Sequence, residues 1–335
     1  MLLRIVIHSF DIRLYMKIYD AYKLAIETGR KNDPRPVSEV ELAMKEENDA
    51  YEALSDDKKQ YFDTERLWNP YSDSRFSAMI EEAKELDAVR FMWGIDIGTG
   101  EMLLADRLRE KGETVSAVVA HHPTGLSKVP FPGVMRIQTD MYAADGVPIN
   151  VCESLMAPRI DLVTRNVMGA NFNQSADAAN LLGIPLFNIH TPADNMVQKY
   201  IDNILEELEP RSLGDIIERL YKEPEYAMAA KMNNPPTIIV GNKNSRCGKV
   251  VSKMTGGTSG PKEMYAKFAQ AGVGTVVGMH FPEDHIEEAR KEGINIIVSG
   301  HMASDSLGIN LICDRWEKEG IEVFGCSGLI RHSRN

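Results

Sequence analysis

Apolar residues recur at helical spacing in the first quarter of the chain. Residues 16–29 place four apolar side chains on one face, which predicts an amphipathic helix ended by Gly29. Ser38 and Glu41 have the spacing of a capping box and predict that a second, more charged helix begins there. A polar segment follows, and then a turn at 69–74. Nothing in this quarter suggests chemistry, so we expect it to serve packing or oligomerisation.

From Phe76 onward the pattern changes. A helix is expected up to about Leu86, and short apolar runs of strand length then alternate with helical periodicity as far as the C-terminus. The expected strands are 89–97, 115–120, 186–189, 237–240, 250–254, 276–279, 294–298 and a last one near 323–324. Alternation of strands and helices predicts an α/β fold with right-handed crossovers.

The chain has 335 residues, of which 43% are hydrophobic, so it can bury a full core and form two lobes. We expect an N-terminal helical extension (1–85), a first α/β lobe with a helical connector (86–235) and a second α/β lobe (236–335). The two lobes are expected to face each other.

The first residues are apolar, but His8, Asp11 and Arg13 interrupt the run long before the roughly 18 residues that a membrane span needs. A small-residue cleavage site for a signal peptide is also missing. We therefore expect residues 1–15 to come from an over-extended start codon, and we assign no targeting signal and no membrane partner.

Charge and cysteine usage narrow the class of protein. The net charge of −11 argues against broad binding of nucleic acid or anionic membranes. The four cysteines, Cys152, Cys247, Cys313 and Cys326, show no CxxC spacing, so neither a disulfide framework nor a cysteine zinc site is indicated. This usage favours a reducing, cytoplasmic setting.

Candidate chemistry gathers at the ends of the predicted strands. Five of the eight histidines follow apolar strand-like runs, namely His121, His122, His190, His280 and His301. Asp194 and Asp305 each come four residues after one of them, and residues four apart share one face of a helix. Because ligands bind outside the carboxyl ends of parallel strands, we expect these side chains to converge on one metal or catalytic site.

Other candidates carry weaker signals. Asp96 also ends a strand, either as an acceptor for a ligand histidine or as a structural residue that starts the next turn. Residues 241–250 contain a Gly-Lys pair, but Val stands where a Walker A loop requires Ser or Thr. The turn at 256–260 precedes a helix and is either an anion cradle or, in the preferred interpretation, a plain turn. His285 is expected on a helix surface, and His332 is expected to have no role.

Three segments resemble the site motifs of a known family. They are VVAHHP at 118–123, NIHTPAD at 188–194 and SGHMASDSLG at 299–308. In order, spacing and strand–helix context they are similar to the motifs of the NIF-three-like proteins, the dinuclear-metal-centre hexameric proteins often labelled GTP cyclohydrolase I type 2-like. The resemblance covers roughly residues 86–335.

The resemblance implies a centre of two divalent transition-metal ions and a ring-shaped homo-oligomer, a hexamer. The metal ligands that it implies are His121, His122, Asp194, His301 and Asp305. His190 would line the site, and a carboxylate such as Asp194 could bridge the ions. Imidazole and carboxylate ligands suit Zn, Fe and Mn alike.

The chain departs from the family pattern twice. The family usually has Glu where this chain has Asp305, which is one methylene shorter and would reach its ion less well or through water. The family also tends to have Thr-Gly-Glu where this chain has Gly278-Met279-His280, so His280 would replace a carboxylate near the site.

The leading functional hypothesis is a metal-dependent hydrolase or cyclohydrolase that uses a metal-activated water on a small substrate, with nucleotides among the candidates. His190 and His280 are the candidate catalytic groups for proton transfer, because imidazole titrates near neutral pH. A metal-binding regulatory, metal-delivery or interaction protein without turnover is the alternative. A third interpretation makes the histidines structural.

Overall fold

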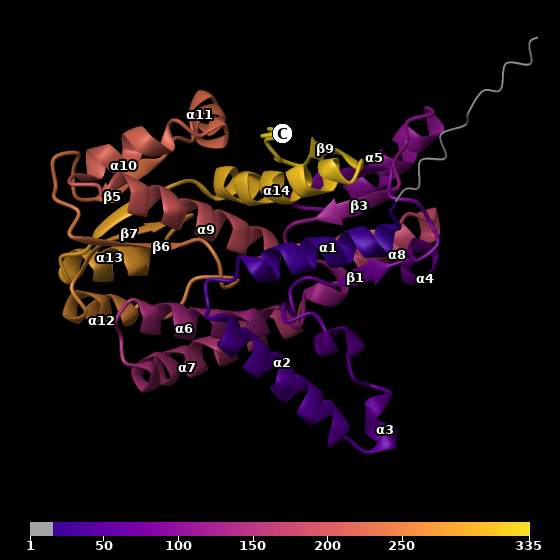
Figure 1. Cartoon of the computed structure of the whole chain (residues 1–335), viewed down its shortest axis with the longest axis horizontal. Coiled ribbons are helices and arrows are strands. Elements are labelled where there is room, and N and C mark those ends of the chain that lie inside the picture. The colour runs from indigo at the N-terminus through magenta and orange to yellow at the C-terminus, as the bar shows by residue number, and fades with distance from the viewer. Residues whose placement is uncertain (1–15) are drawn as a thin grey trace, which may run out of the picture.

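The computed structural model describes residues 16–335, so the expectation for residues 1–15 lies outside the described part of the chain. Two sheets form the framework (Figure 1). The five-stranded sheet has the order β1 (Phe76–Ala78), β4 (Leu186–Asn188), β3 (Ala117–Ala120), β2 (Arg90–Gly94), β9 (Glu322–Cys326). The four-stranded sheet has the order β5 (Thr237–Val240), β8 (Asn295–Val298), β7 (Val273–Gly278), β6 (Lys249–Lys253).

Both sheets are mainly parallel. In the first, only the edge strand β1 runs antiparallel, to β4, and in the second only β5 runs antiparallel, to β8. Strand β3 is an uninterrupted apolar segment whose residues are all buried, as expected for a central strand of a parallel sheet covered on both faces. The predicted α/β class with two lobes is confirmed.

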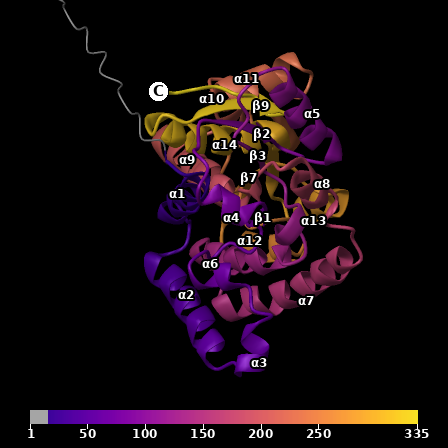
Figure 2. The ribbon, with the colours of Figure 1, turned by 90° about the vertical axis from the view of Figure 1, so that its right-hand side faces the viewer.

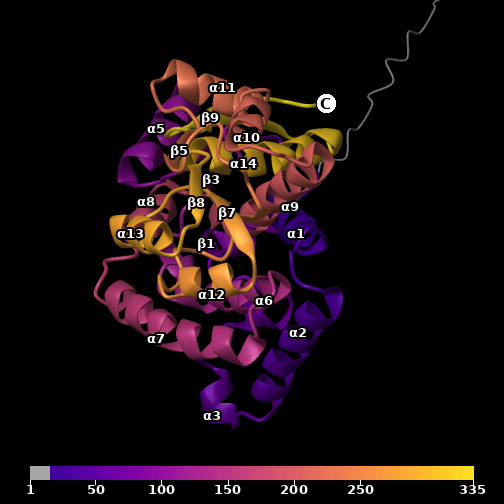
Figure 3. The ribbon, with the colours of Figure 1, turned by 90° about the vertical axis from the view of Figure 1, so that its left-hand side faces the viewer.

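The helices surround and join the sheets. They are α1 (Ile18–Lys31), α2 (Val37–Glu52), α3 (Asp56–Lys59), α4 (Ile80–Ala83), α5 (Thr99–Glu110), α6 (Ile137–Ala144), α7 (Ile149–Met168), α8 (Gln174–Leu182), α9 (Thr191–Leu208), α10 (Leu213–Leu220), α11 (Pro224–Lys231), α12 (Met264–Gln270), α13 (Glu283–Lys291) and α14 (His301–Lys318). Figure 2 shows α6 and α7 beneath the first sheet, with α2 and α3 beyond them. Figure 3 shows α12 and α13 beside the second sheet. Within residues 16–335, no helix is both long and apolar enough to cross a membrane.

Helices α9 and α14 pack against each other where the two lobes meet. Gly308 of α14 lies directly on the backbone of α9, because a Cβ atom added there would be 2.2 Å from the carbonyl oxygen of Ala193. Asp194, in the first turn of α9, and Asp305, one turn into α14, are therefore held close together.

Helix α1 belongs to the core of the first lobe. Its buried Ile18 and Tyr22 pack in one apolar cluster with Phe91 of β2 and Trp316 of α14. The Trp316 indole Nε1–H donates to the carbonyl oxygen of Ala21 at 2.9 Å. Burial of each large apolar side chain stabilises the fold by roughly 2 kcal/mol, so the packing role expected for this quarter is present.

Several local predictions were wrong. Residues 76–78 form a strand rather than the start of a helix, because they pair with β4. Helix α2 has Pro36 at its N-cap without the predicted Ser38 capping box. Gly29 does not end α1, which continues to Lys31, and it instead allows close approach to α9.

The last strand joins a different sheet from the one that the sequence suggested. Strand β9, predicted as part of the second lobe, pairs in parallel with β2 of the first sheet. A short apolar run specifies a strand but not its partner, because pairing is a long-range contact. The boundaries 1–85, 86–235 and 236–335 remain a prediction of the domain organisation.

Candidate metal centre

The structure brings the histidines at the strand ends together. His121 and His122 follow β3, His190 follows the neighbouring β4, and His301 follows β8 of the other sheet. The ring centroids of His121 and His190 are 4.8 Å apart, and those of His122 and His301 are 5.2 Å apart. The site therefore lies where the carboxyl ends of strands from both sheets meet.

Two groups of three side chains could each hold an ion around a shared carboxylate. One consists of His122, His301 and Asp305, and the other of His121, Asp194 and Asp305. One ligand atom from each member lies within 4.8 Å of the others in its group. A third group with this property consists of the imidazoles of His121, His122 and His190.

The distances between these atoms suit metal ligands better than hydrogen bonds. His121 Nε2 is 3.5 Å from Asp194 Oδ1 and 3.6 Å from Asp305 Oδ1. Asp305 Oδ2 lies 3.7 Å from His122 Nε2 and 3.6 Å from His301 Nε2. These separations exceed hydrogen-bond length. Two ligand atoms each about 2.1 Å from a tetrahedral ion would be roughly 3.4 Å apart.

The same atoms have no other partner. His121 Nε2, Asp194 Oδ1 and both carboxylate oxygens of Asp305 are buried and make no hydrogen bond within residues 16–335. Buried polar atoms are nearly always satisfied, and an unpaired buried carboxylate is costly. The residues present therefore fit a bound cation, which would satisfy all four atoms.

The imidazoles of His121 and His122 are each fixed through Nδ1, the ring nitrogen that points away from the centre. Nδ1 of His121 lies 3.1 Å from the Ile189 carbonyl oxygen, and Nδ1 of His122 lies 2.8 Å from Asp96 Oδ1. Since Nδ1 of each donates to an oxygen, Nε2 is left facing the centre, an arrangement typical of ligand histidines. Of the two interpretations left open for Asp96, the geometry supports the acceptor.

His190 is held by a residue that the sequence did not indicate. Its Nδ1 lies 2.6 Å from Asp73 Oδ2, and its backbone N–H donates to Ser74 Oγ at 2.9 Å. Asp73 is fully buried and also accepts a hydrogen bond from the Thr191 hydroxyl at 2.6 Å. In the sequence Asp73 stands in a polar turn far from every histidine motif, so no spacing rule could have found it.

Burial sets the protonation of the centre. Burial and the neighbouring imidazoles lower the pKa of His122 to about 4, and burial also lowers the pKa of His301. Burial raises the pKa of Asp194 well above its ordinary value, although His121 opposes it. Burial alone would raise the pKa of Asp305, but the surrounding histidines outweigh it and lower that pKa. Neutral imidazoles keep the lone pairs that metal binding needs.

His280 and His285 differ from each other. His280 is exposed and lies beside the centre, with its ring centroid 4.6 Å from that of His301, and it belongs to none of the three groups. His285 was expected on a helix surface, but this was wrong, because it is buried with 8% exposure. It faces inward because α13 packs against α12.

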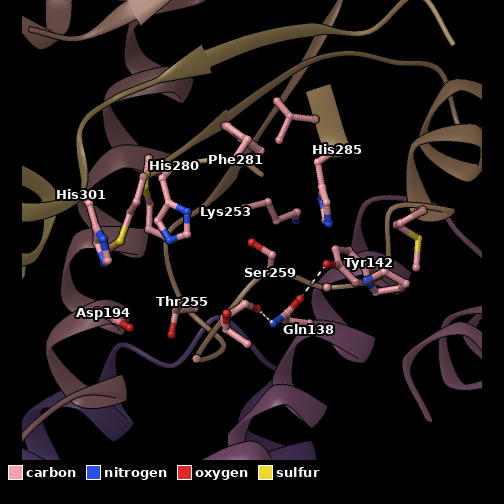
Figure 4. Close-up of a pocket in the computed structure, with 18 of the residues that line it drawn as sticks. Gln138, Tyr142, Asp194, Lys253, Thr255, Ser259, His280, Phe281, His285 and His301 are labelled. Atoms are coloured by element: carbon pink, nitrogen blue, oxygen red, sulfur yellow. Dashed lines mark hydrogen bonds between the residues drawn. The ribbon is translucent and has the colours of Figure 1, made fainter. Parts of the chain in front are cut away.

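A cavity of about 100 Å³ opens beside the centre (Figure 4). His301 and Asp194 stand at one end and His285 and Tyr142 at the other, with Lys253 between them. The cavity could thus hold a small molecule in contact with the centre.

Comparison with known proteins yields matches among solved structures. A NIF3 superfamily protein from Sphaerobacter thermophilus is 32% identical, with a TM-score of 0.68 over 77% of this chain and 92% of that one. Reduced HcgD from Methanocaldococcus jannaschii is 12% identical, with a TM-score of 0.46 over 71% and 83% of the two chains. The protein TTHA1606 from Thermus thermophilus is 14% identical, with a TM-score of 0.44 over 78% and 89%. No family model and no curated protein sequence matches the chain.

Proposed function

The chain belongs to the NIF3 superfamily, and we propose from this and from the geometry of the site that it is a dinuclear metal-dependent hydrolase of small molecules. The observation that carries the proposal is Asp305. Its two buried oxygens have no hydrogen-bond partner, and each faces a different set of ligand atoms. A carboxylate in that position would be able to contribute one oxygen to each of two ions.

The proposed ligand sets follow from the two groups. His122 and His301 would hold one ion with Asp305 Oδ2, and His121 and Asp194 the other with Asp305 Oδ1. The geometry favours Asp305 over Asp194 as the bridge. The shorter side chain does not keep Asp305 away, since its oxygens lie within 3.7 Å of three imidazole nitrogens. Mixed imidazole and carboxylate ligands fit Zn, Fe or Mn.

When bound, such ions supply Lewis-acid polarisation and lower the pKa of a coordinated water. His190 is proposed to move the proton, because its Nε2 lies 3.7 Å from Asp194 Oδ2 at the wall of the cavity. The Asp73 carboxylate on Nδ1 orients the ring. His280 is proposed as a second proton carrier, since it lines the same cavity beside His301.

One observation favours a second function, metal delivery without turnover. The side chain of His301 is 40% exposed and touches the exposed His280. A ligand imidazole beside a second exposed imidazole offers a route for exchange of an ion. Activity measured against metal occupancy separates the two functions, because a hydrolase needs both ions and a delivery protein cleaves nothing.

The first test is metal content per chain by elemental analysis after reconstitution with Zn, Mn or Fe(II). The wild-type protein is expected to hold two ions, and Asp305→Asn to lose both. His332→Ala, which changes a histidine far along the chain from the centre, serves as the matched control and should keep both ions. Two ions in Asp305→Asn, or none in wild type, would contradict the proposal.

We also propose a homo-oligomer, a hexamer, in a reducing and cytoplasmic setting. Leu103, Leu104 and Leu181 are between 46% and 88% exposed on the packed helices α5 and α8, which supports coverage by another copy. All four cysteines are free thiols, in keeping with a reducing compartment. Light scattering of the full chain tests the assembly, and a monomer mass would contradict it.

A further inference from the structure

The cavity beside the centre ends in a compartment that we call the inner chamber. Its walls are Tyr142, Met264, Tyr265, Phe268, Phe281 and His285. We propose that the inner chamber binds a single uncharged aromatic ring of the substrate, whose oxygen-bearing end lies at the metal centre, and that His285 hydrogen-bonds to a polar substituent of that ring. This inference rests on the proposed function of the centre and names the class of its substrate.

The two ends belong to one cavity. Figure 4 shows His301 and Asp194 at one side and His285 and Tyr142 at the other, with Lys253 between them, and all five side chains line the same cavity. A molecule that reaches the inner chamber therefore also meets the metal centre.

The inner chamber has no unpaired charge to offer. Lys253 is the cation that lines the cavity, and its ammonium group is already paired with the Asp145 carboxylate. Both side chains are less than a fifth exposed. The Lys253 Nζ atom also lies 5.4 Å from the ring centre of Tyr142 and 5.7 Å from that of Phe268. An anionic group would have to compete with Asp145, so an uncharged group fits better.

The apolar walls favour an aromatic group. The Tyr142 and Phe268 rings meet edge to face at 5.4 Å, and Met264 and Phe281 complete an apolar surface. Aromatic rings gain from offset and edge-to-face contacts beyond the area that they bury.

His285 supplies the second, independent observation. Its side chain lines the cavity, is 92% buried with 8% exposure, and makes no hydrogen bond within residues 16–335. Its ring stands edge-on to Tyr265, with centroids 5.6 Å apart, and burial lowers its pKa, so the imidazole is neutral. A neutral imidazole has one donor and one acceptor, and here the described part of the chain uses neither. Both ring nitrogens remain accessible from the cavity, so they are available to a ligand.

The floor of the inner chamber limits the size of the ligand. Gln138 Nε2–H donates to the carbonyl oxygens of Gly256 and Thr258 at 2.6 Å, and the Tyr142 hydroxyl donates to Gln138 Oε1 at 2.7 Å. A Cβ atom at Gly260 would lie 2.2 Å from the Tyr142 hydroxyl, so the loop is pressed onto α6. An apolar cavity of about 150 Å³ holds benzene. The whole cavity, including the space at the metal centre, is smaller at about 100 Å³ and is open, so it leaves room for at most one ring and excludes a fused system.

The test compares hydroxamates that share one metal-binding group. Isothermal titration calorimetry of the zinc-loaded full chain measures acetohydroxamic acid, benzohydroxamic acid and the 3- and 4-hydroxybenzohydroxamic acids. We expect benzohydroxamic acid to bind at least tenfold more tightly than acetohydroxamic acid. One of the two hydroxybenzohydroxamic acids should bind at least threefold more tightly than benzohydroxamic acid. His285→Leu should abolish this additional gain in affinity.

A variant that narrows the chamber completes the design. Ser259 lines the cavity on the loop and is half-buried, so Ser259→Leu fills space and should reduce the preference for the aromatic probe below threefold. Ser55→Leu, at an exposed serine without a capping bond, should keep the full preference. Equal affinities for the aromatic and acetyl probes in zinc-loaded wild type would overturn the inner chamber and leave the metal centre standing. Loss of both zinc and hydroxamate binding would overturn the centre and this inference with it.

Discussion

Replacing Asp305 by Asn should change stability in opposite directions with and without metal. Without metal at pH 8, the lowered pKa values of His122 and His301 leave these imidazoles neutral, and the 1%-exposed carboxylate of Asp305 has no hydrogen-bond partner among the described residues. Such a charge costs several kcal/mol. The Asn amide still leaves unsatisfied polar atoms at a cost of about 1–3 kcal/mol. Asp305→Asn should therefore stabilise the metal-free protein by about 2 kcal/mol, or about 3 °C in Tm for a chain of this size.

With metal the sign reverses. An ion at a hundred times its dissociation constant stabilises the folded state by about 2.7 kcal/mol, so two ions raise the wild-type Tm by roughly 8 °C. Asp305→Asn removes one carboxylate oxygen from each proposed ligand set and should lose most of this increase. Zinc-loaded wild type should then melt several degrees above the zinc-treated variant.

The assay is differential scanning calorimetry at pH 8, with protein dialysed against EDTA or loaded with zinc. Asp314→Asn is the matched control, because Asp314 lies on the same helix, is 7% exposed and accepts from the Arg334 backbone N–H at 3.2 Å. It should lower Tm in both states and keep the zinc increase. If Asp305→Asn destabilises the metal-free protein while zinc leaves wild type unchanged, Asp305 is a structural ion-pair residue and the reasoning fails.

Three further predictions follow from the packing around the centre. Asp73→Ala leaves the buried Nδ1 of His190 and the Thr191 hydroxyl without their acceptor, so it should lower stability by about 1–3 kcal/mol in urea unfolding. Zinc content should stay at two ions, because His190 belongs to neither proposed ligand set. Gly308→Ala pushes a methyl group into the backbone of Ala193. It should lower the free energy of unfolding in urea by about 1–3 kcal/mol and reduce the zinc content below two ions per chain. Gly100→Ala, at a position with open space around it, should change neither quantity. In the metal-free folded protein the pKa of His122 is lowered from 6.5 to about 4. As the pH falls, His122 therefore becomes protonated in the unfolded chain before it does so in the folded protein. The contribution of neutral His122 to the free energy of unfolding is fully present above pH 6.5 and should be lost between pH 6.5 and pH 4, by up to about 1.4 kcal/mol per pH unit. A urea midpoint that stays constant across that range would contradict this prediction.

The parts of the site that could be predicted from the sequence are those that depend on residues close together in the chain. His121 and His122 directly follow an apolar run, and the four-residue spacing of His301 and Asp305 places both on one face of a helix. Such local patterns depend on periodicities that survive without tertiary context. The two-lobed α/β class followed for the same reason.

The parts that sequence missed depend on contacts between distant segments. Asp73 acquires its role only because β1 pairs with β4 and brings the preceding turn beside His190. His285 turns inward because α13 packs on α12, although its own helix is strongly charged. No periodicity within either segment contains that information.

The short carboxylate of Asp305 shows how one residue's reach depends on another segment's packing. Asp extends one methylene less than Glu, so a ligand at this position needs its backbone closer to the ions. Helix α14 begins at His301 itself, directly after Gly300 with a φ of 107°, so Asp305 already sits one turn inside the helix. Gly308, one turn further, lets α14 lie on the backbone of α9 beside Ala193. We infer that this close contact, rather than side-chain length, brings Asp305 Oδ1 within 3.6 Å of His121 Nε2. Asp305→Glu should accordingly overfill the centre and lose zinc, whereas retention of both ions in that variant would show that side-chain length, not helix packing, controls the ligand geometry.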